Sequence, residues 1–336
     1  MPDRRGFFKG LLREAVDVVQ EVSSALQSAN EPELWRPPPP VPARPSTQLV
    51  DEDTLIALCS EAGLDHRVAE VRRTVRASLR LTRAIGAGVE LGRSHLGGSP
   101  DVPPGFVWPI WNGRELGFLG QIDLGVVAGV DAGTSLPHEG LLLFFYDLAA
   151  GPSGLSPAHR GSCRVVLVAA RADELEADGR QHAPALRALP VVISRELTLP
   201  GAWSFAAEEL ELSADEMDRW DELRDRLARA QGVELEETNT DRVALHRLLG
   251  YQDEIGREVE LDCQLASAGV DAEDVSLYFE SRADHEAEAR TWRLLLQLSA
   301  DDSLATPDVS FDRLFVCIRE PDLRAGNLDG AWALLR

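Results

Sequence analysis

The chain has 336 residues, of which 44% are hydrophobic, 27% charged and 6% aromatic, as in ordinary folded proteins. This composition excludes a collagen-like, coiled-coil or wholly disordered chain, and the length suits two domains or one duplicated unit. The formal net charge of -22 repels nucleic-acid phosphates and anionic membrane surfaces, so we expect no nucleic-acid partner.

Residues 1–30 are predicted to form an amphipathic helical arm. Apolar residues recur there at spacings of three and four, with charged residues on the opposite face. This apolar stripe requires a covering surface, which is the chain's own body, a partner protein, or a membrane in an export role. The candidate partner-binding residues are Phe7, Phe8, Leu11, Leu12 and Val19.

Arg4 and Arg5 resemble a twin-arginine export motif. Asp3 precedes them where serine or threonine is usual, and charged residues interrupt the region where an apolar h-region would lie. No apolar run approaches the ~18 to 20 residues needed to span a bilayer. We therefore expect a cytoplasmic protein without a transmembrane segment.

A proline-rich linker is predicted at 31–50, between the arm and the body. Arg36–Pro45 contains too many prolines for a helix or a central strand, so it should be an extended, semi-rigid spacer. The alternative is a ligand for an SH3-type domain, because the run satisfies P-x-x-P beside Arg36.

The body, residues 51–336, begins with a helical pattern and continues with strands. Two short helices are predicted over 51–83, with Asp51 or Asp53 as a cap and a basic second helix that includes Arg76, Arg80 and Arg83. Apolar runs punctuated by glycine and proline then predict strands at 116–124, 140–146, 163–169 and 191–199. An acidic helical insert is predicted at 207–237.

A repeated pattern indicates an internal duplication, with halves at about 84–200 and 240–336. Phe118–Asp123 followed by Gly140–Tyr146 parallels Leu294–Ser299 followed by Arg313–Ile318. The first strand of each pair carries a central glutamine, Gln121 or Gln297 in this sequence. A buried amide must be hydrogen-bonded, so each glutamine either ties the halves together through the backbone or lines a ligand pocket.

Several segments resemble the YwqG-like family of uncharacterised bacterial proteins, over a region from about Leu55 to the end. In the first half these are Gly97–Pro109, Phe118–Leu124 and Leu136–Asp147, and in the second half His246–Tyr251, Cys263–Ser267 and Trp292–Gln297. The resemblance implies an α+β fold, a mainly antiparallel β-roll with internal duplication and flanking helices. It implies no established activity, and it does not explain the arm or the linker.

Catalytic and metal-binding motifs are missing from the sequence. There is no G-x-S-x-G elbow, no P-loop, no complete H-E-x-x-H and no calcium loop. The four cysteines are far apart and have apolar neighbours, which favours buried free thiols. We expect no cofactor and no metal, and these absences favour a protein that is not an enzyme without settling the question.

Aromatic residues offer the remaining candidates for a ligand site. Trp108 and Trp111 lie in a Pro/Gly-rich loop, and Trp292 opens the second glutamine strand. Our first hypothesis is a non-enzymatic binding protein that recruits a partner through its N-terminal helix. The alternative is a small-ligand-binding protein or enzyme with a pocket between the two β halves, formed by Trp108, Trp111, Gln121, Tyr251, Trp292 and Gln297.

Overall fold

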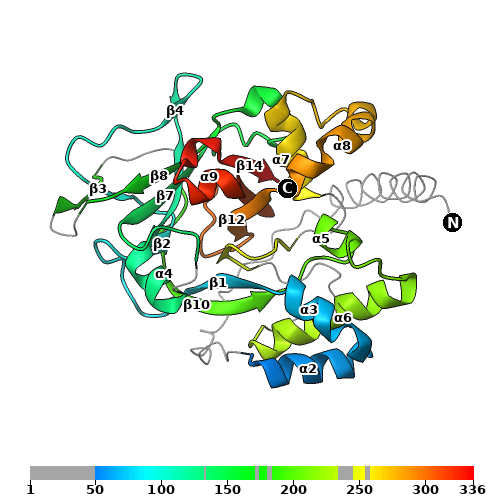
Figure 1. Ribbon diagram of the computed structural model, residues 1–336. Helices are drawn as coiled ribbons and strands as arrows, with labels where there is room; N and C mark the ends of the chain where they lie inside the picture. Colours follow the sequence, from blue (N-terminus) through cyan, green and yellow to red (C-terminus); the bar gives the residue numbers. More distant parts are fainter. Residues whose placement is uncertain (1–49, 132–133, 171–173, 180–183, 234–244, 254–257) are drawn as a thin grey trace, which may run out of the picture. The chain divides into compact units, whose positions relative to one another are not determined.

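The computed structural model describes residues 50–131, 134–170, 174–179, 184–233, 245–253 and 258–336 (Figure 1). The predicted arm, with Phe7, Phe8, Leu11, Leu12 and Val19, lies outside these residues, and so does the predicted linker apart from Val50. The chain divides into two units, Met1–Arg44 and Pro45–Arg336, and the fold below is that of the second unit. Within the described residues no helix is long and apolar enough to cross a membrane.

Ten strands build one large sheet. Their bounds are Arg76–Arg83 (β1), His95–Leu96 (β2), Gly117–Asp123 (β6), Leu141–Tyr146 (β7), Cys163–Val168 (β8), Leu189–Thr198 (β10), Arg247–Leu248 (β11), Trp292–Ser299 (β12), Arg313–Arg319 (β13) and Trp332–Leu335 (β14). The sheet order is β14-β13-β12-β11-β1-β10-β2-β6-β7-β8, and neighbouring strands are antiparallel. Two short pairs lie apart, Asp101–Val102 (β3) with Glu176–Ala177 (β9), and Ile110–Trp111 (β4) with Arg114–Glu115 (β5).

The two ends of the sheet come close together, so the sheet is nearly closed. The loop after β7 reaches β14, where the backbone N–H of Leu335 donates to the carbonyl of Ser153 (3.0 Å). The indole Nε1 of Trp332 donates to the carbonyl of Gly154 (2.7 Å). These bonds occupy polar groups that an open sheet edge would leave unpaired.

Helices cover the outside of this sheet. Their bounds are Glu52–Glu61 (α2), Val68–Thr74 (α3), Leu124–Val130 (α4), Phe205–Glu208 (α5), Ala214–Ala230 (α6), Val259–Ala268 (α7), Val275–Ala289 (α8) and Glu320–Arg324 (α9). Asp51 caps α2, as predicted, by accepting from the N–H of Thr54 (2.8 Å). The predicted α+β class, with flanking helices and antiparallel strands, is confirmed.

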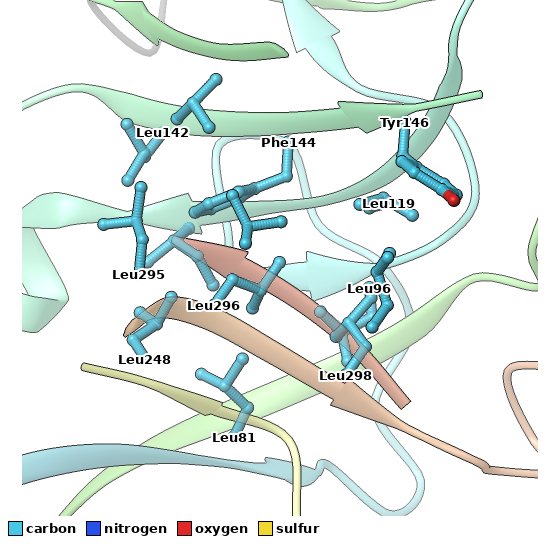
Figure 2. Close-up of a cluster of buried hydrophobic side chains, with 14 of the residues drawn as sticks. Leu81, Leu96, Leu119, Leu142, Phe144, Tyr146, Leu248, Leu295, Leu296 and Leu298 are labelled. Carbon is cyan, nitrogen blue, oxygen red and sulfur yellow. The ribbon is translucent and has the colours of Figure 1, made fainter. Parts of the chain in front are cut away.

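The apolar strands contribute to two hydrophobic cores, because successive side chains of a strand point to opposite faces. In β13, Leu314 and Val316 join the central cluster, which also contains Leu142, Phe144 and Leu296 (Figure 2). The alternate residues of the same strand, Phe315 and Cys317, pack against Val259, Cys263 and Ala266 of α7. Burial on both faces explains why these strands are continuous apolar runs in the sequence.

The segment with Arg76, Arg80 and Arg83 is a strand, so the prediction that these arginines lie on a helix was wrong. Helix α3 ends at Thr74, and β1 then pairs with β10 from Arg76↔Thr198 to Arg83↔Val191. Arginines spaced by three and four suggested a helical face, but Arg80 is buried within the sheet. The four strands predicted between 116 and 199 are confirmed as β6, β7, β8 and β10.

The strand pairs that contain the two glutamines have the same register. β2 pairs with β6 through His95↔Gln121, and β11 pairs with β12 through Arg247↔Gln297. A register shift precedes each glutamine, between Phe118 and Gly120 in β6 and between Leu294 and Leu296 in β12. Gly98 and Gly250 follow β2 and β11 at positive φ, 72° and 74°, which is the left-handed region that favours glycine.

Candidate functional site

Gln121 and Gln297 are fully buried and make the same hydrogen bonds. Oε1 of Gln121 accepts from the N–H of Asp101 (2.8 Å), and Nε2 donates to the carbonyl of Arg93 (2.9 Å) and to Oδ2 of Asp101 (2.6 Å). Oε1 of Gln297 accepts from the N–H of Asp253 (2.9 Å), and Nε2 donates to the carbonyl of Leu245 (2.8 Å) and to Oδ2 of Asp253 (2.9 Å). We call each set a glutamine clamp. The chain itself satisfies both amides, but each glutamine bonds residues of its own predicted half, so these hydrogen bonds do not tie the two halves together.

Trp108 and Trp111 contact different parts of the protein. Trp108 is buried, and its ring centre lies 5.1 Å from that of Phe145. Its Nε1 donates to the carbonyl of Leu116 (2.8 Å). Trp111, half-buried in β4, donates from Nε1 to the carbonyl of Arg160 (2.9 Å). Both indoles thus bond the backbone of the loops that they cover.

Tyr251 and Trp292 are also buried and hydrogen-bonded. The hydroxyl of Tyr251 donates to the carbonyl of Thr74 (2.9 Å), and the guanidinium of Arg76 lies 4.2 Å from its ring centre. Nε1 of Trp292 donates to Oε1 of Gln264 on α7 (3.0 Å). None of the six predicted ligand-binding residues lines either of the two cavities described below.

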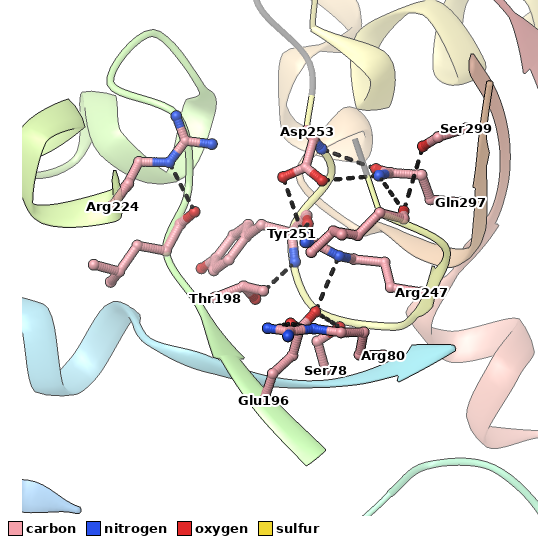
Figure 3. A network of polar contacts seen from close by, with 12 residues as sticks. Ser78, Arg80, Glu196, Thr198, Arg224, Arg247, Tyr251, Asp253, Gln297 and Ser299 are labelled. Carbon is pink, nitrogen blue, oxygen red and sulfur yellow. Dashed lines mark hydrogen bonds and ion pairs between the residues drawn. The ribbon is translucent and has the colours of Figure 1, made fainter. Parts of the chain in front are cut away.

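A buried cluster of charged residues was missed by the sequence analysis. It consists of Arg80 on β1, Glu196 on β10, Arg247 on β11 and Asp253 just after β11, and we call it the Arg–Glu–Arg cluster (Figure 3). The available signal was a set of charges inside apolar segments, since Arg80 stands between Leu79 and Leu81 and Arg247 stands beside Leu248. Charged residues in such segments are almost never fully buried without a partner.

Glu196 lies between the two guanidinium groups. Arg80 donates from Nε to Oε2 of Glu196 (2.7 Å), and its Nη1 donates to the carbonyl of Gln231 (3.0 Å). Nε of Arg247 lies 3.1 Å from Oε1 of Glu196, and Nη1 of Arg247 donates to Oδ1 of Asp253 (3.0 Å). Burial alone would lower the pKa of Arg247, but the Asp253 and Glu196 carboxylates raise it. Asp253 also joins the Gln297 clamp, so the cluster and the clamp share one residue.

The cluster borders a cavity of about 50 Å³. The charged side chains in its wall are Arg80, Arg224, Arg247, Glu196, Asp225 and Asp253. Apolar side chains of Leu197, Leu199 and Leu227 complete one side. A second cavity, of about 10 Å³ beside Asp301 and Phe311, has room for one water molecule at most. The larger cavity is therefore the better candidate for a ligand site.

The four cysteines and His246 are held in structural contacts. All four cysteines are free and buried, as predicted, and burial raises the pKa of Cys163 to about 12. His246 lies 3.3 Å from Asp301 but accepts at Nδ1 from the backbone N–H of Ser299, whose hydroxyl donates to the carbonyl of Leu245. Within the described residues no group of three or more His, Cys, Asp or Glu side chains is placed to hold a metal ion.

The Gln297 clamp should contribute measurably to stability. We expect Gln297→Leu to lower the free energy of unfolding in urea by about 2 kcal/mol, because the N–H of Asp253 loses its acceptor inside the protein. Gln252→Leu is the matched control, since Gln252 is half-buried and donates to the side chain of Glu260 (2.8 Å). An equal loss in both variants would contradict the proposed role of the clamp.

Breaking the Arg–Glu–Arg cluster should cost more than breaking a surface pair. We expect Arg247→Met to reduce the free energy of unfolding by about 3 to 5 kcal/mol, because the buried Glu196 and the half-buried Asp253 are left with less positive charge nearby. Arg72→Met removes an exposed pair with Glu52 and should cost below about 1 kcal/mol. Urea unfolding of both variants measures the difference, and similar values would show that the buried pairing is unimportant.

The buried carboxyl of Glu258, at the start of α7, should make stability depend on pH. Burial raises its pKa to about 7, although it accepts hydrogen bonds from Arg282. The folded protein therefore holds this proton to a higher pH than the unfolded chain, so this group's contribution to stability falls as pH rises from about 4.5 to 7. The expected fall is about 3 kcal/mol in the wild type and is absent in Glu258→Gln, by urea unfolding at several pH values.

Glu216 provides a control of opposite sign for that measurement. Its pKa is lowered, mainly by the hydrogen bond from Arg67, so its contribution is present above about pH 4.5 and is lost as pH falls. Glu216→Gln should therefore change the profile on the acid side only. If Glu258→Gln leaves the slope between pH 5 and 7 unchanged, the assigned pKa of Glu258 is wrong.

The sequence comparisons place most of the candidate site, but not Arg80, within a recognised family region. Residues 94–335 match the family described as "Domain of unknown function (DUF1963)". The matched region begins just before β2 and ends in β14, so it contains both glutamines and both clamp aspartates but not Arg93 or β1. The search of curated proteins gives no significant match. The family match covers well over half of the chain, which therefore belongs to the DUF1963 family.

Proposed function

We propose that this protein is a non-enzymatic binding protein of the YwqG-like kind, in which the β-rich body is a scaffold and the N-terminal helix recruits a partner protein. The observation that carries the proposal is the engagement of the four cysteines and His246 in structural contacts. The cysteines are buried, and the imidazole of His246 accepts from the backbone. This arrangement needs no catalytic set, cofactor or metal.

The body consists, in this proposal, of two repeats that arose by duplication. The support is the pair of glutamine clamps, which share strand register, bulge position and hydrogen-bond partners. The repeats run from β1 to β8 and from β10 to β14, and the acidic helical insert that contains α6 lies within the second. This division differs from the predicted halves, about 84–200 and 240–336, because β1 joins the first repeat and β10 with the insert moves to the second.

The recruiting element is the amphipathic arm at 1–30, on the proline-rich linker. Its support is the sequence pattern of Phe7, Phe8, Leu11, Leu12 and Val19, and the division of the chain between Arg44 and Pro45. The net charge of -22 favours a protein partner over a nucleic acid and agrees with a cytoplasmic location. The second candidate function, small-ligand binding, is favoured by the cavity beside Arg80 and Arg247.

Removal of the arm tests the recruiting role. Full-length protein and a variant without residues 1–44 serve as baits in extract from the source cells, and the captured proteins are compared by mass spectrometry. We expect a partner that is captured by the full-length chain and lost with the deletion, because the apolar stripe that it covers is gone.

Two double variants test whether the partner recognises the apolar stripe or only requires that the arm be present. Leu11→Glu with Leu12→Glu places charge on the apolar stripe and should abolish capture, whereas Gln20→Glu with Gln27→Glu adds the same charge elsewhere on the arm and should not. Equal thermal unfolding temperatures show that the body is intact. Capture that is unchanged by the deletion would remove the arm from the proposed function.

A further inference from the structure

Two arginines bond the same serine near the C-terminal end of α7. Nη2 of Arg160, in the loop after β7, donates to the carbonyl of Ser267, and Nη2 of Arg319, at the end of β13, donates to the Ser267 hydroxyl (3.1 Å). Arg319 also donates to Oε1 of Gln264, about one turn earlier on α7 (3.0 Å). The fold thus brings together two guanidinium groups from segments that are far apart in the sequence.

Each of these guanidinium groups lies over the indole of a buried tryptophan. The Cζ atom of Arg160 is 5.5 Å from the ring centre of Trp332, and that of Arg319 is 5.0 Å from the ring centre of Trp292. Attraction between the cations and the ring faces restricts the orientation of both side chains. Such preorganisation lowers the entropy cost of binding a ligand to them.

Neither arginine has a carboxylate partner among the described residues, since their side-chain bonds go to Ser267 and Gln264. The acidic residue next to Arg319 in the sequence is Glu320, and its carboxylate is engaged by Arg293 and Arg324. The two positive charges beside Ser267 are therefore not neutralised by a bonded carboxylate.

The guanidinium groups have unused donors that solvent can reach. Each guanidinium has five N–H donors. Arg160 is exposed and uses one of them, toward Ser267, whereas Arg319 is half-buried and uses only its Nη2. Nε and Nη1 of Arg319 do not belong to the buried polar atoms that lack a partner in the described residues, so they have access to solvent. Both arginines can therefore bind an acceptor that arrives from solution.

The end of α7 does not require these unused donors. Gly269, at a φ of 98°, closes the helix, and its N–H donates to the carbonyl of Ala266 (3.2 Å), while the N–H of Val270 donates to the carbonyl before that one (2.9 Å). Arg319 bonds only side chains of the helix, and Arg160 uses a single nitrogen for a helix carbonyl. The other donors serve no part of the fold that the structure describes.

Two guanidinium groups beside one serine favour a phosphate group over a carboxylate. Arginine binds both anions through pairs of parallel hydrogen bonds, but a carboxylate has two oxygens and one charge, so one guanidinium satisfies it. A phosphate monoester has three free oxygens and a charge of about −1.5 to −2 at neutral pH, so two guanidinium groups can share it. The chain's charge of -22 does not prevent this contact, because distant charges are screened beyond about 8 Å at physiological ionic strength.

We propose that Arg160 and Arg319 form a binding site for a phosphate group, which is either free phosphate or the phosphate of a small monoester. The phosphate oxygens accept from the unused donors of both guanidinium groups, while Ser267 and the two tryptophans hold these groups in place. The inference goes beyond the proposed function, because it involves neither the N-terminal arm nor the cavity beside Arg80 and Arg247. No bond is made or broken, so binding is its only consequence.

A titration of the full-length protein with inorganic phosphate, methyl phosphate and acetate, at constant ionic strength, tests this proposal. The readout is the shift of arginine Nε–H signals in ¹⁵N NMR spectra, assigned to Arg160 and Arg319 by substitution. We expect saturable shifts with inorganic phosphate, at a dissociation constant on the order of 1 mM, and about tenfold weaker binding of acetate. Equal binding of methyl phosphate shows that monoesters are accepted, and its failure to bind limits the site to free phosphate; either result supports a phosphate site.

Three variants make the result specific to these two arginines. Arg160→Gln changes an exposed residue and should weaken phosphate binding about tenfold without changing the thermal unfolding temperature. Arg319→Gln should have a similar effect on binding, and Arg160→Gln keeps the test valid if this variant folds poorly. Arg72→Gln, the matched control, removes an exposed arginine that pairs with Glu52 and should bind phosphate like wild type.

Any of three results would overturn the proposal. Acetate that binds as tightly as phosphate would mean that the arginines attract anions without selecting a phosphate group. Shifts that never saturate would reflect screening by salt and not a binding site. Phosphate binding that survives both Arg160→Gln and Arg319→Gln, or that Arg72→Gln weakens equally, would place the ligand elsewhere. Loss of partner capture on deleting the arm is a separate measurement, so failure of either proposal can be told from failure of the other.

Discussion

The rest of the sheet depends on one constraint. The buried side-chain amide of the glutamine on β6 and that of the glutamine on β12 must each be hydrogen-bonded. β6 and β12 are buried on both faces, so Gln121 and Gln297 have no water to bond. Each amide bonds the side chain of an aspartate and the backbone carbonyl of the residue eight positions before that aspartate. These bonds hold the two-residue strands β2 and β11, too short to be stable by themselves, in a fixed register. β2 and β11 in turn pair with β10 and β1, which join to complete the sheet.

Much of the strand content could be predicted from the sequence, because strands buried on both faces are apolar runs of recognisable length. The partners of the glutamines could not, since Asp101 lies in the two-residue strand β3 and Asp253 in a loop, and the paths of both segments depend on the tertiary fold. The structure places His95 in correspondence with Arg247, and not with the neighbouring His246. Because this correspondence is offset by one residue from the second histidine, the sequence did not reveal that a guanidinium replaces the imidazole at this position.

β1 shows why a charge pattern misleads when burial is unknown. Arg76, Arg80 and Arg83 have helical spacing, and an exposed basic helix is the ordinary interpretation of such spacing. In a strand, however, Arg80 points to the face where Glu196 is buried. The aromatic candidates do not form one site, because each of them bonds a different part of the chain. Trp108, Tyr251 and Trp292 have polar tips that bond nearby groups, so they complete separate cores.

The position of the Arg–Glu–Arg cluster follows from an exchange of first strands between the proposed repeats. β1 belongs to the first repeat but pairs with β11 of the second, and β10 of the second pairs with β2 of the first. Arg80, Glu196 and Arg247 therefore come from three strands that meet only when both repeats are folded and paired. The equivalent crossing near His95 has the same strand connectivity without these charges. If both repeats descend from one ancestor, the pairing of a first strand with the other repeat occurs twice in the sheet. Divergence at Arg80, Glu196 and Arg247 then adds the guanidinium groups to one of the two copies only.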